Sequence, residues 1–287
     1  MKRIGAVLNP LLWVVCLMGL SIAPVTADEG RLGDELYKPY VGQPGKDVIW
    51  VPTPDAMVDE MIQAAEVGPH DLVVDLGAGD GKIAIAAALR RGARAVGIEF
   101  DPAMAALAKR NAQRAGVSDR VTIVEGDLFK VDFSQATVVT MYLLPELNMR
   151  LKPILRAMRP GTRIVSHSFG MESWSPDRRI ETANASGYLW IVPANFQGLW
   201  NLDLPAGRKA KLTLKQIHQQ LSGSLELDGK TIPIEEGRVT GYGLTIQFGP
   251  GGGRPLSLRG QLMNRKISGE LLEAGKSQLV DGSKAGN

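Results

Sequence analysis

The chain has 287 residues, of which 44% are hydrophobic and 6% aromatic, and it carries 33 glycines, 17 prolines and a formal net charge of +3. This composition predicts a globular protein with a buried core, and it excludes a disordered or collagen-like chain. Because the only cysteine is Cys16, the sequence offers no pair of cysteines for a disulfide and no thiolate metal site.

The first 27 residues have the pattern of a secretory signal peptide. Lys2 and Arg3 precede an apolar run over residues 11–22, and small residues follow as far as Ala27. The apolar run is short for a membrane span, so we expect cleavage near Ala27 and export to the periplasm or envelope. The alternative is an uncleaved, membrane-anchored segment, which is the only route to membrane association that we expect.

The next segment, residues 28–54, is a polar lead-in that ends in a turn at Pro52-Thr53-Pro54. From Asp55 apolar residues recur at helical spacing, which predicts a helix that ends near Gly68. Thr53 or Asp55 is available as its N-cap.

Strand and helix patterns then alternate as far as Asp177. The expected strands are 71–76, 95–99, 121–125, 136–143 and 163–168, and the expected helices are 83–89, 104–115 and 147–158. Alternation of this kind predicts the α/β class: a doubly wound, Rossmann-like parallel sheet, covered on both faces, in a domain of residues 55–177.

The second half of the chain has a different pattern, because helical periodicity gives way to short alternating runs. We expect a linker over residues 178–198 and an antiparallel β-rich domain, a meander or small barrel, over residues 199–275. The last residues, 276–287, are polar and are expected to form a flexible tail.

A glycine motif lies between the first strand and the next helix of the predicted sheet, in the run Asp75-Leu76-Gly77-Ala78-Gly79-Asp80-Gly81. Its spacing is GxGxG rather than the GxGxxG of dinucleotide folds. S-adenosylmethionine has no pyrophosphate, and glycines let its methionine part approach the backbone where a Cβ would collide. Asp75 is placed to order this loop or to meet the ammonium group of the ligand.

Two further acidic residues lie where strands end. Glu99 ends the second strand 22 residues after Gly77, at the spacing of an acid that binds both ribose hydroxyls. Asp127 follows the third strand and suits the adenine amino group, with Leu128 beside the ring and Phe100 over its other face. Each residue alone has an ordinary structural reading, as a surface acid or a helix cap, but their order on successive elements favours a cofactor site.

These motifs resemble the class I S-adenosylmethionine-dependent methyltransferases over about residues 50–170. The runs Trp50–Pro54, Asp75–Ile83 and Asp127–Ser134 are most similar to the mitochondrial lysine methyltransferases of the adenine nucleotide translocase and ATP synthase, and to their prokaryotic relatives. The resemblance implies cofactor and substrate roles for the segment before the first strand. The cofactor-binding residues expected are Pro52, Thr53, Asp75, Gly77, Ala78, Gly79, Asp80, Gly81, Glu99, Phe100, Asp127 and Leu128.

Methyl transfer from a sulfonium needs no nucleophilic side chain, only an aligned and deprotonated acceptor. Tyr142, at the carboxyl end of the expected fourth strand, is the candidate pocket wall and hydrogen-bond partner, together with Thr53 from the resemblance. Glu146 and Asn148 are weaker candidates. His167 is interpreted as a strand-end histidine bonded to backbone rather than as a base. With three scattered histidines, no metal site is expected.

The charge balance limits which classes of molecule can be the methyl acceptor. Residues 28–177 carry 17 basic and 21 acidic side chains, so a nucleic-acid partner is disfavoured. The run Tyr142-Leu143-Leu144-Pro145 also lacks the Asn/Asp-Pro-Pro-aromatic signature of amide and adenine methyltransferases. We therefore expect a methyltransferase acting on an amine of a protein, such as lysine, or of a small molecule. The alternative is an exported, non-catalytic binding or assembly protein that retains the fold.

Overall fold

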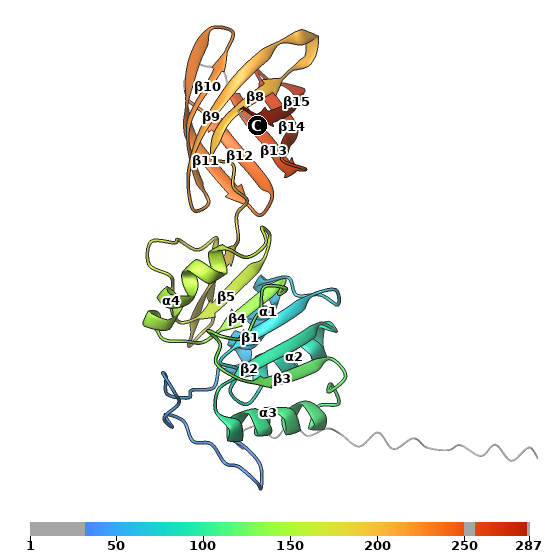
Figure 1. Cartoon of the computed structure of the whole chain (residues 1–287), viewed down its shortest axis with the longest axis vertical. Coiled ribbons are helices and arrows are strands. Elements are labelled where there is room, and N and C mark those ends of the chain that lie inside the picture. Colours follow the sequence, from blue (N-terminus) through green and yellow to red (C-terminus); the bar gives the residue numbers. More distant parts are fainter. Residues whose placement is uncertain (1–31, 250–255, 286–287) are drawn as a thin grey trace, which may run out of the picture. The chain divides into compact units, whose positions relative to one another are not determined.

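The computed structural model describes residues 32–249 and 256–285, and the expected signal peptide lies outside this range. Among the residues described, no helix has the length and apolar character needed to cross a membrane. The described chain consists of a mixed α/β sheet followed by a β-barrel (Figure 1).

The first part is a seven-stranded sheet with the order β3-β2-β1-β4-β5-β7-β6. Its strands are β1 (Leu72–Leu76), β2 (Arg94–Glu99), β3 (Val121–Glu125), β4 (Val138–Met141), β5 (Arg163–His167), β6 (Arg178–Glu181) and β7 (Ser186–Ile191). Its helices are α1 (Asp55–Ala64), α2 (Lys82–Arg91), α3 (Pro102–Arg114) and α4 (Pro145–Arg156). The expected α/β class is confirmed, and β1 to β5 pair in parallel as expected, whereas β6 and β7 make the sheet mixed.

The prediction of a linker over residues 178–198 is wrong for most of that stretch. Strand β7 pairs antiparallel with β5, and β6 pairs antiparallel with β7, so both belong to the sheet. These strands are short, and β6 has a single buried residue, Ile180, which gives too weak an alternation to distinguish a strand from a linker.

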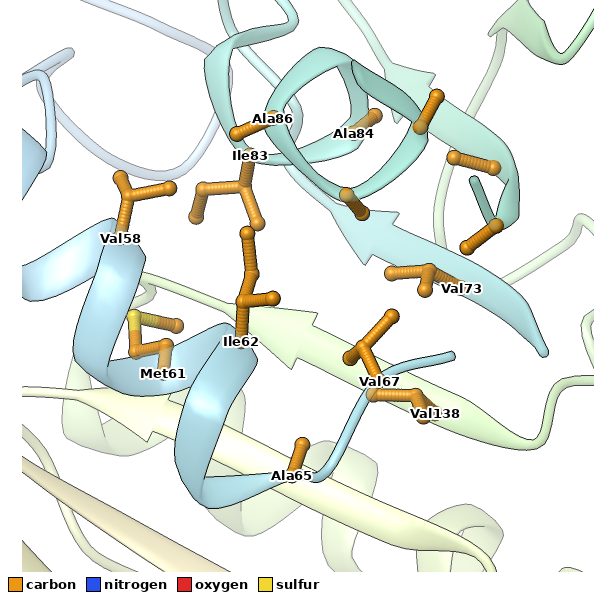
Figure 2. Close-up of a cluster of buried hydrophobic side chains, with 14 of the residues drawn as sticks. Val58, Met61, Ile62, Ala65, Val67, Val73, Ile83, Ala84, Ala86 and Val138 are labelled. Atoms are coloured by element: carbon orange, nitrogen blue, oxygen red, sulfur yellow. The ribbon is translucent and has the colours of Figure 1, made fainter. Parts of the chain in front are cut away.

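Both faces of the sheet are buried because alternate residues of each strand point to opposite sides. Val73 of β1 belongs to a cluster with residues of α1, α2 and α3, whereas its neighbour Val74 packs in a second cluster with α4. Figure 2 shows the first cluster, where Ile62 of α1 and Ile83 of α2 lie above the sheet.

The helix ends show which residues set the boundaries. Asp101 caps α3 by accepting a hydrogen bond from Met104 N at 2.7 Å. The expectation that Thr53 or Asp55 caps α1 is wrong: the N-cap is Pro54, with no side-chain bond. The Thr53 hydroxyl is therefore free for another contact, described below.

The second part is a closed antiparallel barrel of eight strands, in the order β10-β11-β12-β13-β14-β15-β8-β9. They are β8 (Gly198–Asp203), β9 (Lys209–Ile217), β10 (Gln220–Leu227), β11 (Lys230–Thr240), β12 (Gly243–Phe248), β13 (Leu256–Met263), β14 (Lys266–Glu273) and β15 (Lys276–Lys284), and a short 3-10 helix, η1 (Pro205–Gly207), follows β8. Alternation fills the interior with apolar side chains: in β9, Leu212 and Leu214 are buried while Lys211 and Lys215 are exposed.

The tail prediction for residues 276–287 is wrong over β15. This strand pairs with β14 on one side and β8 on the other, so it closes the barrel. Its sequence is polar because only Val280 and Gly282 are buried.

Candidate functional site

The loop between β1 and α2 has a backbone that only glycine adopts without strain. Gly77, Gly79 and Gly81 have φ values of 75°, 56° and 84°. A Cβ on Gly79 would lie 2.6 Å from Trp50 Nε1, and one on Gly77 would lie 3.0 Å from the Leu143 side chain. Gly81 does not line the pocket at this loop: it is the N-cap of α2.

Glu99, at the end of β2, is held against this loop by two backbone donors. Its Oε2 accepts from Gly79 N at 2.8 Å and its Oε1 accepts from Asp101 N at 2.9 Å. Burial raises the pKa of this carboxyl, and the two hydrogen bonds oppose that shift. Each oxygen keeps a lone pair, so the carboxylate can accept two ligand hydroxyls.

Asp127 forms an ion pair with Lys46, a residue that was not predicted from the sequence. Its Oδ2 accepts from Lys46 Nζ at 2.8 Å, and its Oδ1 accepts from Phe129 N at 3.0 Å. The Lys46 hydrogen bond is the main cause of the lowered pKa of Asp127. Lys46 Nζ also lies 4.7 Å from the centre of the Phe100 ring. No local signal could reveal this pair, because its members are 81 residues apart.

The described part of the lead-in segment, residues 32–54, contributes to the pocket wall through residues 43–53. Asp34 ties its start to α3 by accepting from Arg110 Nε at 2.6 Å, and this bond is the main cause of the lowered pKa of Asp34. At its other end the Trp50 ring lies against Gly79. The lead-in is polar and lacks periodicity, so only the family resemblance of Trp50–Pro54 pointed to this role, and nothing pointed to residues 43–49.

Asp75 is buried and lines the pocket, and within the described chain its carboxyl is hydrogen-bonded to Thr140. The register sets Asp75 opposite Thr140 of β4, whose Oγ1 donates to Asp75 Oδ1 at 2.7 Å. Burial raises the pKa of Asp75 to about 7, against the hydrogen bond that lowers it. The carboxyl is therefore poised to ionise when a cation arrives.

Tyr142, Thr53 and His167 meet at another part of the site. Thr53 Oγ1 lies 3.2 Å from His167 Nδ1, and the centroids of the Tyr142 and His167 rings are 3.9 Å apart. The interpretation of His167 as a histidine bonded to backbone is wrong: its ring contacts two of the expected site residues. Burial lowers its pKa to about 4.

These groups border one pocket. Of the residues expected from the sequence, it is lined by Pro52, Thr53, Asp75, Gly77, Ala78, Gly79, Asp80, Glu99, Phe100, Asp127, Leu128 and Tyr142. Their chemistry fits S-adenosylmethionine: a cradle that a Cβ would fill, a carboxylate for the ribose, and Asp75 for the ammonium group.

Removing the Glu99 carboxylate tests the ribose assignment. We expect Glu99→Ala to weaken S-adenosylmethionine binding by about 2 kcal/mol, because charge-assisted hydrogen bonds are lost. Glu125→Ala is the matched control, since Glu125 ends the neighbouring strand opposite Glu99 and is exposed. Calorimetric titration measures both. Equal affinities for the two variants would refute the assignment.

Comparison with known proteins places this site in a family. The model of the ANTKMT methyltransferase domain matches residues 75–178. A protein-lysine N-methyltransferase of Saccharolobus islandicus is 42% identical over 151 residues, which are 50% of this chain and 94% of that protein. The adenine nucleotide translocase lysine N-methyltransferase of Mus musculus is 34% identical over 147 residues, and the match spans 51% of this chain and 59% of the mouse protein.

A solved methyltransferase structure is also similar to this chain. A protein described as an RNA methyltransferase of Salinibacter ruber, in complex with S-adenosyl-L-homocysteine, is 49% identical. The match has a TM-score of 0.50 and covers 51% of this chain and 96% of that one. The archaeal lysine methyltransferase is also matched over almost its whole length. With the glycine cradle and Glu99 in place, this chain belongs to the ANTKMT family of class I S-adenosylmethionine-dependent methyltransferases.

Proposed function

We propose that this protein binds S-adenosylmethionine and transfers its methyl group to the side-chain amine of a protein lysine. The observation that carries the proposal is a single pocket that joins the glycine cradle and Glu99 to Thr53 and Tyr142. The names of the archaeal and mitochondrial relatives support lysine as the acceptor.

The mechanism follows from what each group can do. When bound, S-adenosylmethionine supplies a methyl group on a positively charged sulfur. Glu99 and the glycine loop fix its position, and Thr53 and Tyr142 border the space where an acceptor would enter. The acceptor lysine must be a neutral amine when it attacks. The buried His167 beside this space is uncharged, so it does not stabilise the protonated, ammonium form of the lysine.

RNA is disfavoured as the acceptor, although the Salinibacter relative is described as an RNA methyltransferase. Nucleic-acid binding relies on basic side chains that neutralise phosphates. The half of the chain that holds the site, residues 28–177, has 21 acidic and 17 basic side chains. A protein lysine, which is cationic in solution, suits this balance better.

The decisive experiment incubates the purified chain from Asp28 onward with S-adenosylmethionine and an envelope-protein extract, then maps methylated residues by mass spectrometry. We expect methyl groups on lysine side chains, and none when the lysines have first been acetylated. Methylation of RNA added to the same reaction, with unmodified proteins, would refute lysine as the acceptor.

We also propose that the protein is exported, on the basis of the signal-peptide pattern in residues 1–27. Cell fractionation followed by N-terminal sequencing tests this. A periplasmic protein that begins at Asp28 is expected. An intact amino terminus in the membrane fraction would instead support the anchored alternative.

A further inference from the structure

Three side chains from distant segments meet beside the pocket. Thr53 precedes α1, Tyr142 follows β4, and His167 ends β5. Thr53 and Tyr142 line the pocket, whereas His167 does not and is only 3% exposed. His167 can therefore influence a bound acceptor only through these two neighbours.

The charge state of His167 limits its role. Burial lowers its pKa to about 4, so the imidazole is neutral at physiological pH and carries one N–H and one lone pair. A group that holds a proton so rarely at neutral pH is a poor general base. Its remaining capacity is to direct a hydrogen bond, and Nδ1 lies 3.2 Å from Thr53 Oγ1.

We propose that His167 is a positioning residue for methyl transfer: Nδ1 accepts the Thr53 hydroxyl hydrogen, so that Thr53 Oγ1 presents its lone pairs to an N–H of the acceptor amine. This inference rests on the proposed function. The opposite direction, with Nδ1–H donating, would leave the Thr53 hydrogen free to occupy the amine lone pair that must attack.

Methyl transfer to the lysine nitrogen needs only the lysine, water and the bound cofactor as reactants. The lysine ammonium first loses a proton to water, and the neutral nitrogen is held by Thr53 through one N–H. The nitrogen lone pair then forms the new N–C bond as the C–S bond breaks, and the electron pair of that bond stays on sulfur. No side chain takes a proton in the transfer itself.

The backbone around His167 is braced, as a positioning role requires. Ser168 has a φ of 62°, a left-handed conformation that costs energy outside glycine and persists only where surrounding structure holds it. Ser168 N donates to Ser186 O at 2.8 Å. The buried Asn148 of α4 donates through Nδ2 to Phe169 O at 3.1 Å. The turn that carries the imidazole is thus held from β7 and α4.

Four variants test the proposal in steady-state kinetics. His167→Leu and Thr53→Val should each lower kcat about 10- to 100-fold, while the calorimetric Kd of His167→Leu for S-adenosyl-L-homocysteine stays within about twofold. His167→Asn, which can place Oδ1 near the Nδ1 position, should recover most of the kcat. The double variant Thr53→Val/His167→Leu should be no slower than Thr53→Val alone, because His167 acts through Thr53. His70→Ala, an exposed histidine, is the matched control.

A second readout does not depend on activity. The chain has three histidines, so the imidazole nitrogen signals can be assigned by NMR. His167 should show an unprotonated Nδ1 and a protonated Nε2, with no titration from about pH 5.5 to 8.5, and its Nδ1 signal should shift in Thr53→Val.

The outcomes separate the two proposals. A protonated Nδ1, or an unchanged kcat in His167→Leu with an active wild type, overturns the role of His167 alone. If His167→Leu fails to fold, the kcat of Thr53→Val and of His167→Asn decides. A wild type that transfers no methyl group to lysine overturns the proposed function, and NMR still decides the direction of the Thr53–His167 bond.

Discussion

Replacing Asp75 with asparagine is expected to stabilise the free protein at pH 8 and to weaken cofactor binding at the same pH. The folded-state pKa of about 7 lies above the ordinary aspartate pKa of 3.8, so folding favours the protonated acid. The buried carboxylate therefore costs stability increasingly from about pH 4 to 7, at about 1.4 kcal/mol per pKa unit. Asparagine keeps an oxygen for Thr140 and has no charge to bury.

Melting temperatures from pH 4 to 8 measure the first effect. The melting temperature of Asp75→Asn should rise relative to that of the wild type as pH increases through this window. The difference between the two melting temperatures should level off above pH 7. The buried amide N–H groups of the new asparagine should in addition lower the melting temperature of the variant by the same amount at every pH. Melting curves whose difference does not change with pH would show that the Asp75 carboxyl titrates normally.

Calorimetry measures the second effect. At pH 6 the wild type should release a proton when the cationic cofactor binds, so its heat of binding should depend on the ionisation enthalpy of the buffer more than that of Asp75→Asn. At pH 8 the variant should bind about 10- to 100-fold more weakly, since a charge-assisted contact is lost. Equal affinity at pH 8 would remove Asp75 from the cofactor site.

The parts of the fold that the sequence predicted are those set by local pattern. The run from Asp75 to Gly81 contains its own turn chemistry, and the strand at its start, β1, is buried along most of its length, as expected for a strand covered on both faces. Glu99 and Asp127 could be placed because strand ends in a parallel sheet meet at one edge.

What the sequence could not predict depends on contacts between distant segments. Lys46 reaches Asp127 across 81 residues, and Thr53 reaches His167 across 114. In the barrel, β15 has a polar sequence, and hydrogen bonds with its two neighbours, β14 and β8, make it a strand. Neither periodicity nor residue type signals such pairings in a single sequence.

The largest loss of cofactor binding is expected for Gly79→Ala. Alanine at a φ of 56° is strained by about 1–2 kcal/mol, and its Cβ would lie 2.6 Å from Trp50 Nε1. Gly116→Ala is the matched control: its φ is 68°, with no heavy atom of the described chain within 4 Å of the added Cβ. Both variants should have lower melting temperatures than the wild type, but only Gly79→Ala should lose measurable S-adenosylmethionine binding.

A second variant separates two reasons for this glycine. Trp50→Ala/Gly79→Ala removes the clash with the indole ring and keeps the added Cβ on a residue that lines the pocket. If glycine is needed because the ligand approaches the backbone, the double variant should recover melting temperature without recovering binding. Trp50→Ala alone measures how much binding depends on the indole ring, which lines the pocket, and so serves as the control for the double variant. Recovered binding in the double variant would instead mean that Gly79 serves to seat Trp50, and that the cradle is built for the lead-in segment.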